Sequence, residues 1–233
     1  MTNHPTNPTT GPTTDPATSP GSSASAPAFR AAWTRDWPAY FDAVAGKPPR
    51  ETLCRALDLF DADLTFDAAT AHAIDLGCGE GRDTMELLKR GWSVLAIDGH
   101  PDAIRRLVLR QDLAPTPRLR MQLTELESLE LPPVRLVNAS FTLPFCRPDA
   151  FDRLWRTIVD AIEPGGRFAG QIFGDRDTWA ALPDRTHHTR DQAEALFRHF
   201  DLERFTEDEH DAADAQGQDK HWHVFHVVAR KRR

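Results

Sequence analysis

Short apolar runs alternate with amphipathic segments along most of the chain beyond residue 70, which predicts strands and helices in turn. The helix pattern is clearest from Phe151 to Ile162, where apolar residues recur at steps of three and four. Further helices are expected at 82–90, 101–111 and 189–200, the last with Thr189 as its cap. The predicted strands cover 71–76, 92–98, 118–126, 134–140, 165–173, 202–208 and 220–231.

This order predicts an α/β fold. Alternating strand and helix units form a mostly parallel, doubly wound, Rossmann-like sheet of seven strands, which binds ligands at the carboxyl ends of its strands. The last two strands have only a polar, acidic loop between them, so we expect an antiparallel hairpin with an antiparallel C-terminal strand. An aromatic-rich segment from about residue 30 predicts an amphipathic helix or lid, and a second helix follows it.

The domain boundary follows a change in composition. Residues 1–28 are mostly Thr, Pro, Ser, Asn, Gly and Ala, and such a segment buries too little apolar surface to offset its ordering entropy. We therefore expect a disordered tail over 1–28 and a single domain over 29–233.

Charge and composition narrow the class of protein. A net charge of -7 argues against a chain built to bind nucleic acid. No apolar run approaches the roughly 18 residues of a membrane span, and no secretory signal is expected. The cysteines are isolated and read as reduced thiols, which predicts a cytoplasmic protein.

The stretch "AIDLGCGEGRD" places a glycine-rich loop directly after a predicted strand. Its spacing is G-x-G-x-G, and Arg82 stands where a dinucleotide fold needs its last glycine. Two acids, Asp75 and Glu80, suit a cationic ammonium or sulfonium better than a pyrophosphate. The loop therefore favours S-adenosylmethionine over NAD.

"AIDLGCGEGRDT" and "VLAIDGHPDAI" resemble the first two motifs of the class I S-adenosylmethionine-dependent methyltransferases. The resemblance implies that the loop passes under the methionine part of the cofactor and that Asp98 takes both ribose hydroxyls. A carboxylate can accept two hydrogen bonds from a cis-diol. Asp98 lies 21 residues after Gly77, which suits one strand–helix–strand step. Asp75 would contact the cofactor ammonium through water or hold the loop amides.

Two later segments extend the resemblance. "LTELESLELP" matches the segment in which an acid contacts the adenine amino group, here Glu125 with Leu126 beside the ring. "LVNASFTLPF" matches the fourth-strand motif, which lines the cofactor and the acceptor pocket with Asn138, Ala139, Ser140 and Phe141. This motif lacks the prolines found in enzymes that methylate bases or amides, so it favours a small acceptor. The predicted cofactor contacts are Asp75, Gly77, Cys78, Gly79, Asp98, Gly99, Glu125, Leu126, Asn138 and Ala139.

The resemblance spans residues 30 to 230 and is closest to bacterial small-molecule methyltransferases of the tellurite-resistance type, many of which share "GEGRD". It implies in-line transfer of a methyl group to a small-molecule acceptor, by a monomer or homodimer. The alternatives are a non-catalytic S-adenosylmethionine-binding or regulatory module and an NAD-dependent dehydrogenase, which Arg82 disfavours.

No catalytic residue follows from the sequence. A soft acceptor needs no base, whereas an oxygen or amine acceptor needs one, for which Asp175 or a histidine qualifies. The loop residues Asp175, Arg176 and Asp177 line the acceptor site or cap a helix. No metal is expected, because the late histidines lack metal-ligand spacing; they are His187, His188, His210, His221, His223 and His226.

Two aromatic residues of the early segment, Trp37 and Tyr40, either cover the cofactor site as a lid or pack on the sheet. Lys47 and Arg50 are candidates to pair with the cofactor carboxylate or an anionic substrate.

Overall fold

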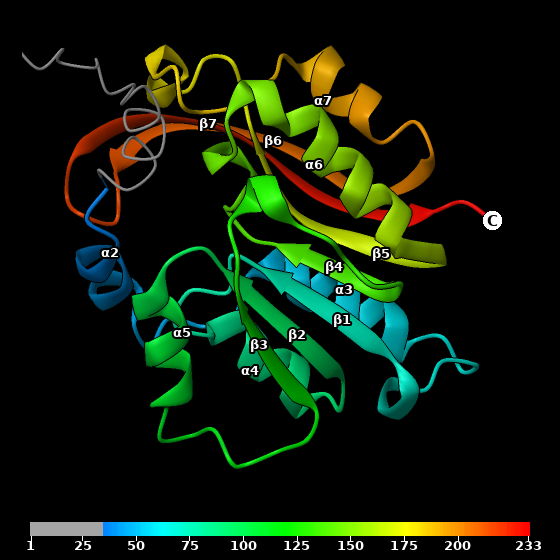
Figure 1. The fold of residues 1–233 in the computed structure, drawn as a ribbon. Coiled ribbons are helices and arrows are strands. Elements are labelled where there is room, and N and C mark those ends of the chain that lie inside the picture. Colours follow the sequence, from blue (N-terminus) through cyan, green and yellow to red (C-terminus); the bar gives the residue numbers. More distant parts are fainter. Residues whose placement is uncertain (1–34) are drawn as a thin grey trace, which may run out of the picture.

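Seven strands form one sheet in the order β3-β2-β1-β4-β5-β7-β6 (Figure 1). The computed structural model describes residues 35–233, so the tail predicted over 1–28 lies outside the described residues. Strands pair in parallel from β3 to β5, and β7 runs antiparallel to both β5 and β6. The predicted mostly parallel sheet with an antiparallel C-terminal strand is confirmed. The strands are β1 (His72–Leu76), β2 (Ser93–Asp98), β3 (Leu119–Leu123), β4 (Val134–Ala139), β5 (Ile162–Phe173), β6 (Phe200–Ala213) and β7 (Asp219–Lys231).

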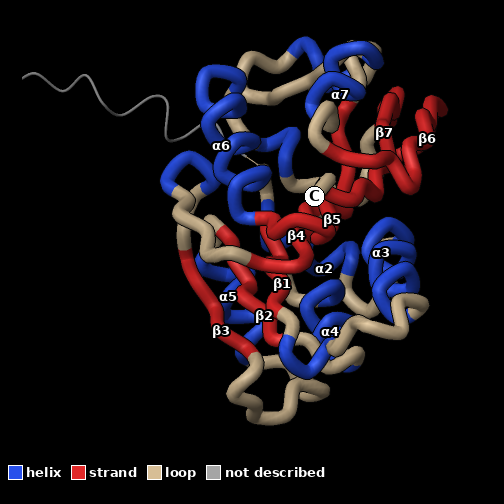
Figure 2. The backbone as a smooth tube through the Cα atoms, turned by 90° about the vertical axis from the view of Figure 1, so that its right-hand side faces the viewer, coloured by secondary structure: helices blue, strands red, loops and turns tan. Residues whose placement is uncertain are grey.

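Helices cover both faces of the sheet. The apolar sides of α6 and α7 pack on one face, and those of α3, α4 and α5 pack on the other. Figure 2 shows α6 and α3 on opposite sides of the strands. The helices are α2 (Trp37–Val44), α3 (Glu51–Asp61), α4 (Arg82–Lys89), α5 (Pro101–Val108), α6 (Pro148–Ala161) and α7 (Arg190–Leu196), and the 3-10 turns are η1 (Ala68–Thr70), η2 (Leu126–Ser128), η3 (Leu143–Phe145) and η4 (Thr178–Ala181).

The clearest periodic segment of the sequence is α6. Its buried side chains, Phe151, Leu154, Trp155 and Ile158, lie on one side of the helix and enter the larger core. Burying each such side chain contributes about 1.5–3 kcal/mol. Ile162 continues the apolar pattern but begins β5, so the helix ends one residue earlier than the pattern predicts.

The acidic segment after residue 208 is a strand and not the loop predicted for it. β6 continues to Ala213, which pairs with Asp219 of β7, and only residues 214–218 form the turn. Pairing with β7 satisfies the backbone groups of this polar segment and outweighs its low strand propensity. The result is a long hairpin that extends beyond the body of the sheet (Figure 1).

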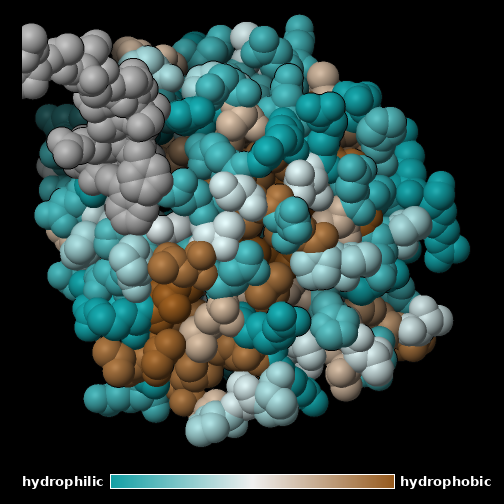
Figure 3. All heavy atoms as spheres, in the orientation of Figure 1, coloured by the Kyte–Doolittle hydropathy of each residue, from teal (hydrophilic) through white to brown (hydrophobic). Residues whose placement is uncertain are grey.

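Exposed apolar side chains gather over α5 and β3 (Figure 3). They are Val108, Leu109, Met121 and Leu123. Within residues 35–233, no helix has the length and apolar character that crossing a membrane requires.

Candidate active site

A cavity of about 690 Å³ lies at the carboxyl ends of the strands. One half is lined by the loop after β1 and by the ends of β2 and β3, and the other half by the ends of β4 and β5 and by the β6–β7 hairpin. The strand order reverses between β1 and β4, and open α/β sheets bind ligands at this kind of reversal.

The glycine loop is held tightly between neighbouring strands. Gly77 and Cys78 both donate their backbone N–H to the carbonyl of Ile97, over 2.8 and 3.0 Å. Gly77 has a φ of +70°, and a β-carbon there would overlap the side chain of Thr142. Glycine is therefore required at this position for both its backbone angle and its lack of a side chain.

Asp98 connects this loop to the end of β2. Its carboxylate accepts hydrogen bonds from the backbone N–H groups of Gly79, at 2.9 Å, and His100, at 2.8 Å. Burial raises the pKa of this carboxyl group. Asp98 lines the cavity together with its neighbour Gly99.

Glu125 lies beside Gly99, on the segment after β3. It lines the cavity with Leu126, and burial together with the nearby charge of Glu127 raises its pKa. A cavity half bearing Asp98, Glu125 and Glu127 is electrically suited to a cationic ligand with hydroxyl and amino donors.

Four other predicted cofactor contacts lie outside the cavity lining: Asp75, Cys78, Asn138 and Ala139. Asp75 and Asn138 face each other across β1 and β4 and are fully buried. The Asn138 amide donates to Asp75 at 2.8 Å and to Asp83 at 3.0 Å, and Thr84 donates to Asp75 at 2.5 Å. These side chains thus bind the first turn of α4 to the sheet instead of reaching the cavity.

Burial and the adjacent Asp83 raise the pKa of Asp75 to about 7. Cys78 is buried beside Ala96 and Leu107, and burial raises the pKa of its thiol well above the usual value. The thiol is therefore neither at the cavity nor ionised at neutral pH.

Aromatic rings form the wall of the second half. Phe141 lies two residues after the end of β4 and has a φ of +54°, an unusual conformation for a bulky residue. Its N–H donates to Gln171 at 2.9 Å, and the guanidinium of Arg50 lies 4.3 Å from its ring centroid. Such strain of about 1–3 kcal/mol gathers at functional sites. The other aromatic residues of this wall are Phe173, Trp179 and Trp222.

Of the late histidines, only His210 and His226 line the cavity. His187 and His188 are partly buried beside Phe173 and Phe151, respectively. His221 and His223 lie on the other face of the hairpin, because successive strand residues point to opposite sides.

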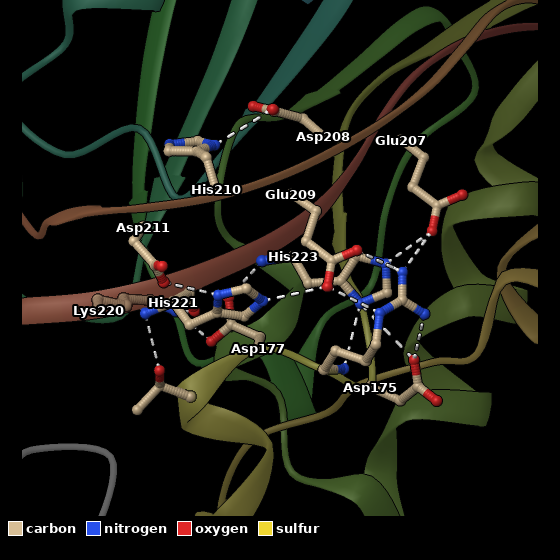
Figure 4. Close-up of polar contacts among 12 residues, drawn as sticks. Asp175, Asp177, Glu207, Asp208, Glu209, His210, Asp211, Lys220, His221 and His223 are labelled. Carbon is tan, nitrogen blue, oxygen red and sulfur yellow. Dashed lines mark hydrogen bonds and ion pairs between the residues drawn. The ribbon is translucent and has the colours of Figure 1, made fainter.

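The predicted loop residues Asp175, Arg176 and Asp177 also lie outside the cavity lining. Asp177 forms a buried ion pair with Lys220, and Arg176 joins the network on the outer face of the hairpin (Figure 4). Asp175 lies 3.6 Å from the ring of His223 in that network. The structure therefore does not bring Asp175 to a position where it could act as the base.

One trio within residues 35–233 has the spacing of metal ligands. Glu207, Glu209 and His223 place ligand atoms within 4.8 Å of one another. Arg176 donates to Glu207 at 2.8 Å and to Glu209 at 2.7 Å, so its guanidinium bridges the two carboxylates. The trio is an ion-pair network with its own cation.

The segment around α2 covers the cavity. Trp37, Tyr40, Lys47 and Arg50 all line it, as a lid requires. The amide of Gln216, in the hairpin turn, donates to the carbonyl of Asp36 at 3.1 Å. Two segments distant in sequence therefore meet at the rim of the cavity (Figure 1).

Several residues that line the cavity were not predicted from the sequence. Phe173 ends β5, so its place at the carboxyl edge was available as a signal. The positions of Asp208 and Trp222 at the cavity could not be predicted from the sequence. They depend on the length of β6 and on its register with β7, which decide which side chains face the cavity.

Comparisons with known proteins agree with this arrangement. A family profile described as a methyltransferase domain matches residues 73–166, which include the glycine loop, Asp98 and Glu125. No curated protein sequence gives a significant match.

Solved structures share the fold at low sequence identity. TehB from Haemophilus influenzae is 15% identical with a TM-score of 0.62, and the match covers 77% of this chain but only 62% of TehB. The N-methyltransferase NodS from Bradyrhizobium japonicum WM9, in complex with S-adenosyl-l-homocysteine, is 14% identical with a TM-score of 0.61, covering 84% and 97% of the two chains.

A third solved structure is similar over nearly all of both chains. The Burkholderia thailandensis 1,6-didemethyltoxoflavin-N1-methyltransferase, with 1,6-didemethyltoxoflavin and S-adenosylhomocysteine bound, is 22% identical with a TM-score of 0.57, and the match covers 95% of this chain and 94% of that one. The part of this chain that contains the glycine loop is therefore similar to a methyltransferase domain, and its fold is shared with the solved methyltransferases NodS and the Burkholderia thailandensis enzyme.

Proposed function

We propose that this enzyme transfers the methyl group of S-adenosylmethionine to a small-molecule acceptor by in-line displacement. The observation that carries the proposal is the continuity of the cavity, which joins an acidic half at β1–β3 to an aromatic half at β4–β7. A donor in the first half and an acceptor in the second would meet near Ser140 and Phe141, which line the cavity after the central strand β4.

The acidic half supplies groups that match the cofactor. We assign the ribose hydroxyls to Asp98, the adenine to Glu125 and Leu126, and the methionine part to the loop at Gly77 and Gly79. Support comes from the geometry of Asp98, whose oxygens each accept one backbone hydrogen bond and so keep a fixed orientation with acceptor capacity left. Gly99 adds to the same wall.

Lys47 and Arg50 are the cations that would meet the carboxylate of the cofactor or of an anionic substrate. Both line the cavity on the segment after α2. The remaining predicted contacts act indirectly in this proposal, because Asp75 and Asn138 fix the turn that presents the loop.

When bound, the cofactor supplies a methyl group already activated by the positive charge of its sulfonium. The protein then contributes orientation and exclusion of water. The lid residues Trp37 and Tyr40 and the hairpin turn serve the second purpose, since they enclose the cavity from two sides.

A small acceptor fits the volume that remains beside the cofactor, since small-molecule sites span about 300–1,000 Å³ in total. The toxoflavin enzyme, similar in fold, was solved with a small heterocycle bound. The three unpaired cysteines fit a reducing compartment, so we assign the protein to the cytoplasm, where it acts as a monomer or homodimer.

Binding of S-adenosylmethionine to Asp98→Ala, measured by calorimetry, tests the assignment. We expect affinity to fall about 10- to 100-fold, because hydrogen bonds to a charged group contribute about 1.5–3 kcal/mol. Asp112→Ala is the control, since that carboxylate is exposed and pairs with Arg110. Equal affinity of the two variants would contradict the role of Asp98.

Turnover is tested separately as formation of S-adenosylhomocysteine with a panel of small acceptors. Product formation supports catalysis. Tight cofactor binding without turnover on any acceptor would favour a non-catalytic binding module.

A further inference from the structure

We propose that Asp208 and His210 form a general-base pair in the acceptor half, and that the acceptor is a flat aromatic ring carrying an ionisable O–H or N–H group. This inference rests on the proposed methyl transfer and specifies its substrate class. It comes from the hydrogen bonds of the two cavity histidines and from the rings beside them.

The hairpin separates two sets of polar residues. Residues of β6 alternate between its faces, so Asp208 and His210 point into the cavity while Glu207 and Glu209 point outward to Arg176. Figure 4 shows the two sets on opposite sides of the strand. The inward set is therefore free of the ion-pair network that uses the outward carboxylates.

The hydrogen bond between Asp208 and His210 sets the tautomer of the imidazole. Nδ1 of His210 lies 3.2 Å from Oδ1 of Asp208. A carboxylate accepts and does not donate, so Nδ1 carries the hydrogen and Nε2 keeps its lone pair. Within residues 35–233, Nε2 has no hydrogen-bond partner. This is the arrangement of a histidine base oriented by an acid.

His226 cannot take the same role. The Phe141 N–H donates to Oε1 of Gln171, so the amide nitrogen of Gln171 faces Nδ1 of His226, at 3.4 Å. Nδ1 must then accept, and the hydrogen lies on Nε2, which points toward Asp208 at 3.8 Å. Burial lowers the pKa of His226, so the ring is neutral and acts as a hydrogen-bond donor.

Other charged groups stand near the pair without occupying it. Arg204 and Glu51 form an ion pair behind His226. Arg35 and Asp214 line the same end of the cavity. Among residues 35–233, Nε2 of His210 is thus a basic nitrogen of the acceptor half without a hydrogen-bond partner, and charges of both signs lie around it.

The rings beside this nitrogen favour a flat acceptor. Trp222 is the cross-strand partner of His210 and faces the same side of the hairpin. The centroid of its ring lies 6.3 Å from that of Phe141 and 6.1 Å from that of Phe173, both near perpendicular. The ring centroid of Trp179 lies 5.8 Å from that of Trp222, and the guanidinium carbon of Arg35 lies 4.6 Å from the Trp179 centroid. An aromatic ring stacked in this enclosure would present its edge to His210.

The step balances without a further reagent. The O–H or N–H bond of the acceptor breaks, its proton goes to Nε2 of His210, and its electron pair forms the bond to the methyl carbon. The electron pair of the broken carbon–sulfur bond stays on the sulfur atom, which gives S-adenosylhomocysteine. His210 is exposed and returns the proton to solvent.

The experiment compares protic rings with an acceptor that needs no base. The probes are 8-hydroxyquinoline and benzimidazole as protic rings, benzenethiol as a ring that ionises near neutral pH, and ethanolamine as an aliphatic acceptor. We expect turnover of a protic ring by the intact chain. Turnover of only benzenethiol or ethanolamine overturns the inference and leaves methyl transfer intact, whereas no turnover with any probe, despite cofactor binding, counts against both.

The variant His210→Gln tests the base. We expect its kcat on the protic ring to fall by about 10²- to 10³-fold, the range of general-base catalysis, with benzenethiol changed less than about twofold. Added imidazole should restore part of the loss, because the site is open to solvent. His221→Gln, on the outer face of the same strand pair, is the matched control. Equal losses on the protic ring and the thiol overturn the base.

Asp208 is a positioning residue and needs its own readout. In Asp208→Asn we expect kcat on the protic ring to fall while KM and the turnover of benzenethiol stay nearly unchanged, because the imidazole loses the acceptor that orients it. The cofactor affinity should stay unchanged. An unchanged kcat on the protic ring contradicts the pairing.

Discussion

At the scale of single residues, Asp75 shows how an acid in a binding motif can serve the fold. It precedes the glycine loop, yet its carboxylate is buried and contacts Thr84 and Asn138. The side-chain amide of Asn138 also donates to one oxygen of Asp83, and the other oxygen accepts the backbone N–H of Arg50 at 2.9 Å. This cluster joins β1, β4, α4 and the segment before α3 behind the glycine loop.

The raised pKa of Asp75 predicts a pH dependence of stability. Its value of about 7 in the folded protein exceeds the 3.8 of a free aspartate, so the folded state binds the proton more tightly. The stabilisation is complete below about pH 4 and is lost as the pH rises through about 7. We expect the free energy of unfolding of the intact chain to fall relative to that of Asp75→Asn between pH 5 and pH 8.

Urea unfolding at several pH values measures this difference, with Asp112→Asn as the control for a carboxylate on the surface. A difference between Asp75→Asn and the intact chain that does not change with pH would show that Asp75 stays ionised throughout.

At the scale of elements, the β6–β7 hairpin is fixed to the loop after β5 by a buried ion pair. Lys220 and Asp177 are both almost completely buried. Asp177 also accepts the N–H of Trp179 at 2.9 Å and of His223 at 3.2 Å, so one carboxylate holds both η4 and β7. The ammonium of Lys220 lies 4.2 Å from the ring centroid of Trp179 and 4.3 Å from that of Trp222.

Removing one partner of this pair should be more damaging than removing both. We expect Asp177→Ala to lower the free energy of unfolding by about 3–5 kcal/mol, because it leaves a buried, unpaired ammonium. The double variant Asp177→Ala with Lys220→Met should regain part of that loss, as measured by urea unfolding followed through tryptophan fluorescence. Asp201→Ala, which breaks an exposed pair with Arg232, should change little. Strictly additive effects of the two buried changes would contradict the coupling.

The hairpin also marks where prediction from sequence stops. Most strands and helices could be predicted because their apolar residues repeat with the period of the element, as in α6, and Thr189 caps α7 as its position predicts. The extension of β6 could not be predicted, because its polar residues form a strand through pairing with β7 and show no alternation of apolar and polar positions.

The candidate site divides in the same way. The glycine spacing and the acid after β2 indicate the cofactor half, because short local motifs carry them. Which of Asp75, Asn138 and Asp98 reaches the cavity depends on contacts between distant strands. The pairing of Asp208 with His210 depends in addition on how far β6 extends.

At the scale of the whole molecule, the cavity is closed by segments from opposite ends of the described chain. α2 buries only Phe41 and Val44, and it contacts α5 through Arg106, which pairs with Asp42 and lies 5.6 Å from the ring centroid of Phe41. α3, by contrast, buries five residues against the sheet. The lid is thus attached far more lightly than its neighbour in sequence.

Hydrogen exchange should report this difference. We expect the amides of Trp37–Val44 and of residues 214–218 to exchange more slowly when S-adenosylhomocysteine is bound, because the ligand supplies contacts that α2 lacks by itself. Amides of α3 serve as the internal control and should be unaffected. Mass spectrometry showing equal exchange of α2 with and without ligand would exclude a lid role.

The antiparallel β7 has a consequence for how such an enzyme diversifies. Because β7 runs back beside β5, its hairpin with β6 is one continuous stretch of the chain that walls the acceptor half, while the cofactor half comes from an earlier stretch. Under the proposed function, insertions or exchanges within 200–231 would reshape the acceptor space and leave the proposed nucleoside contacts in place. The gene segment for one hairpin would then be the unit by which methyl transfer is redirected to new compounds.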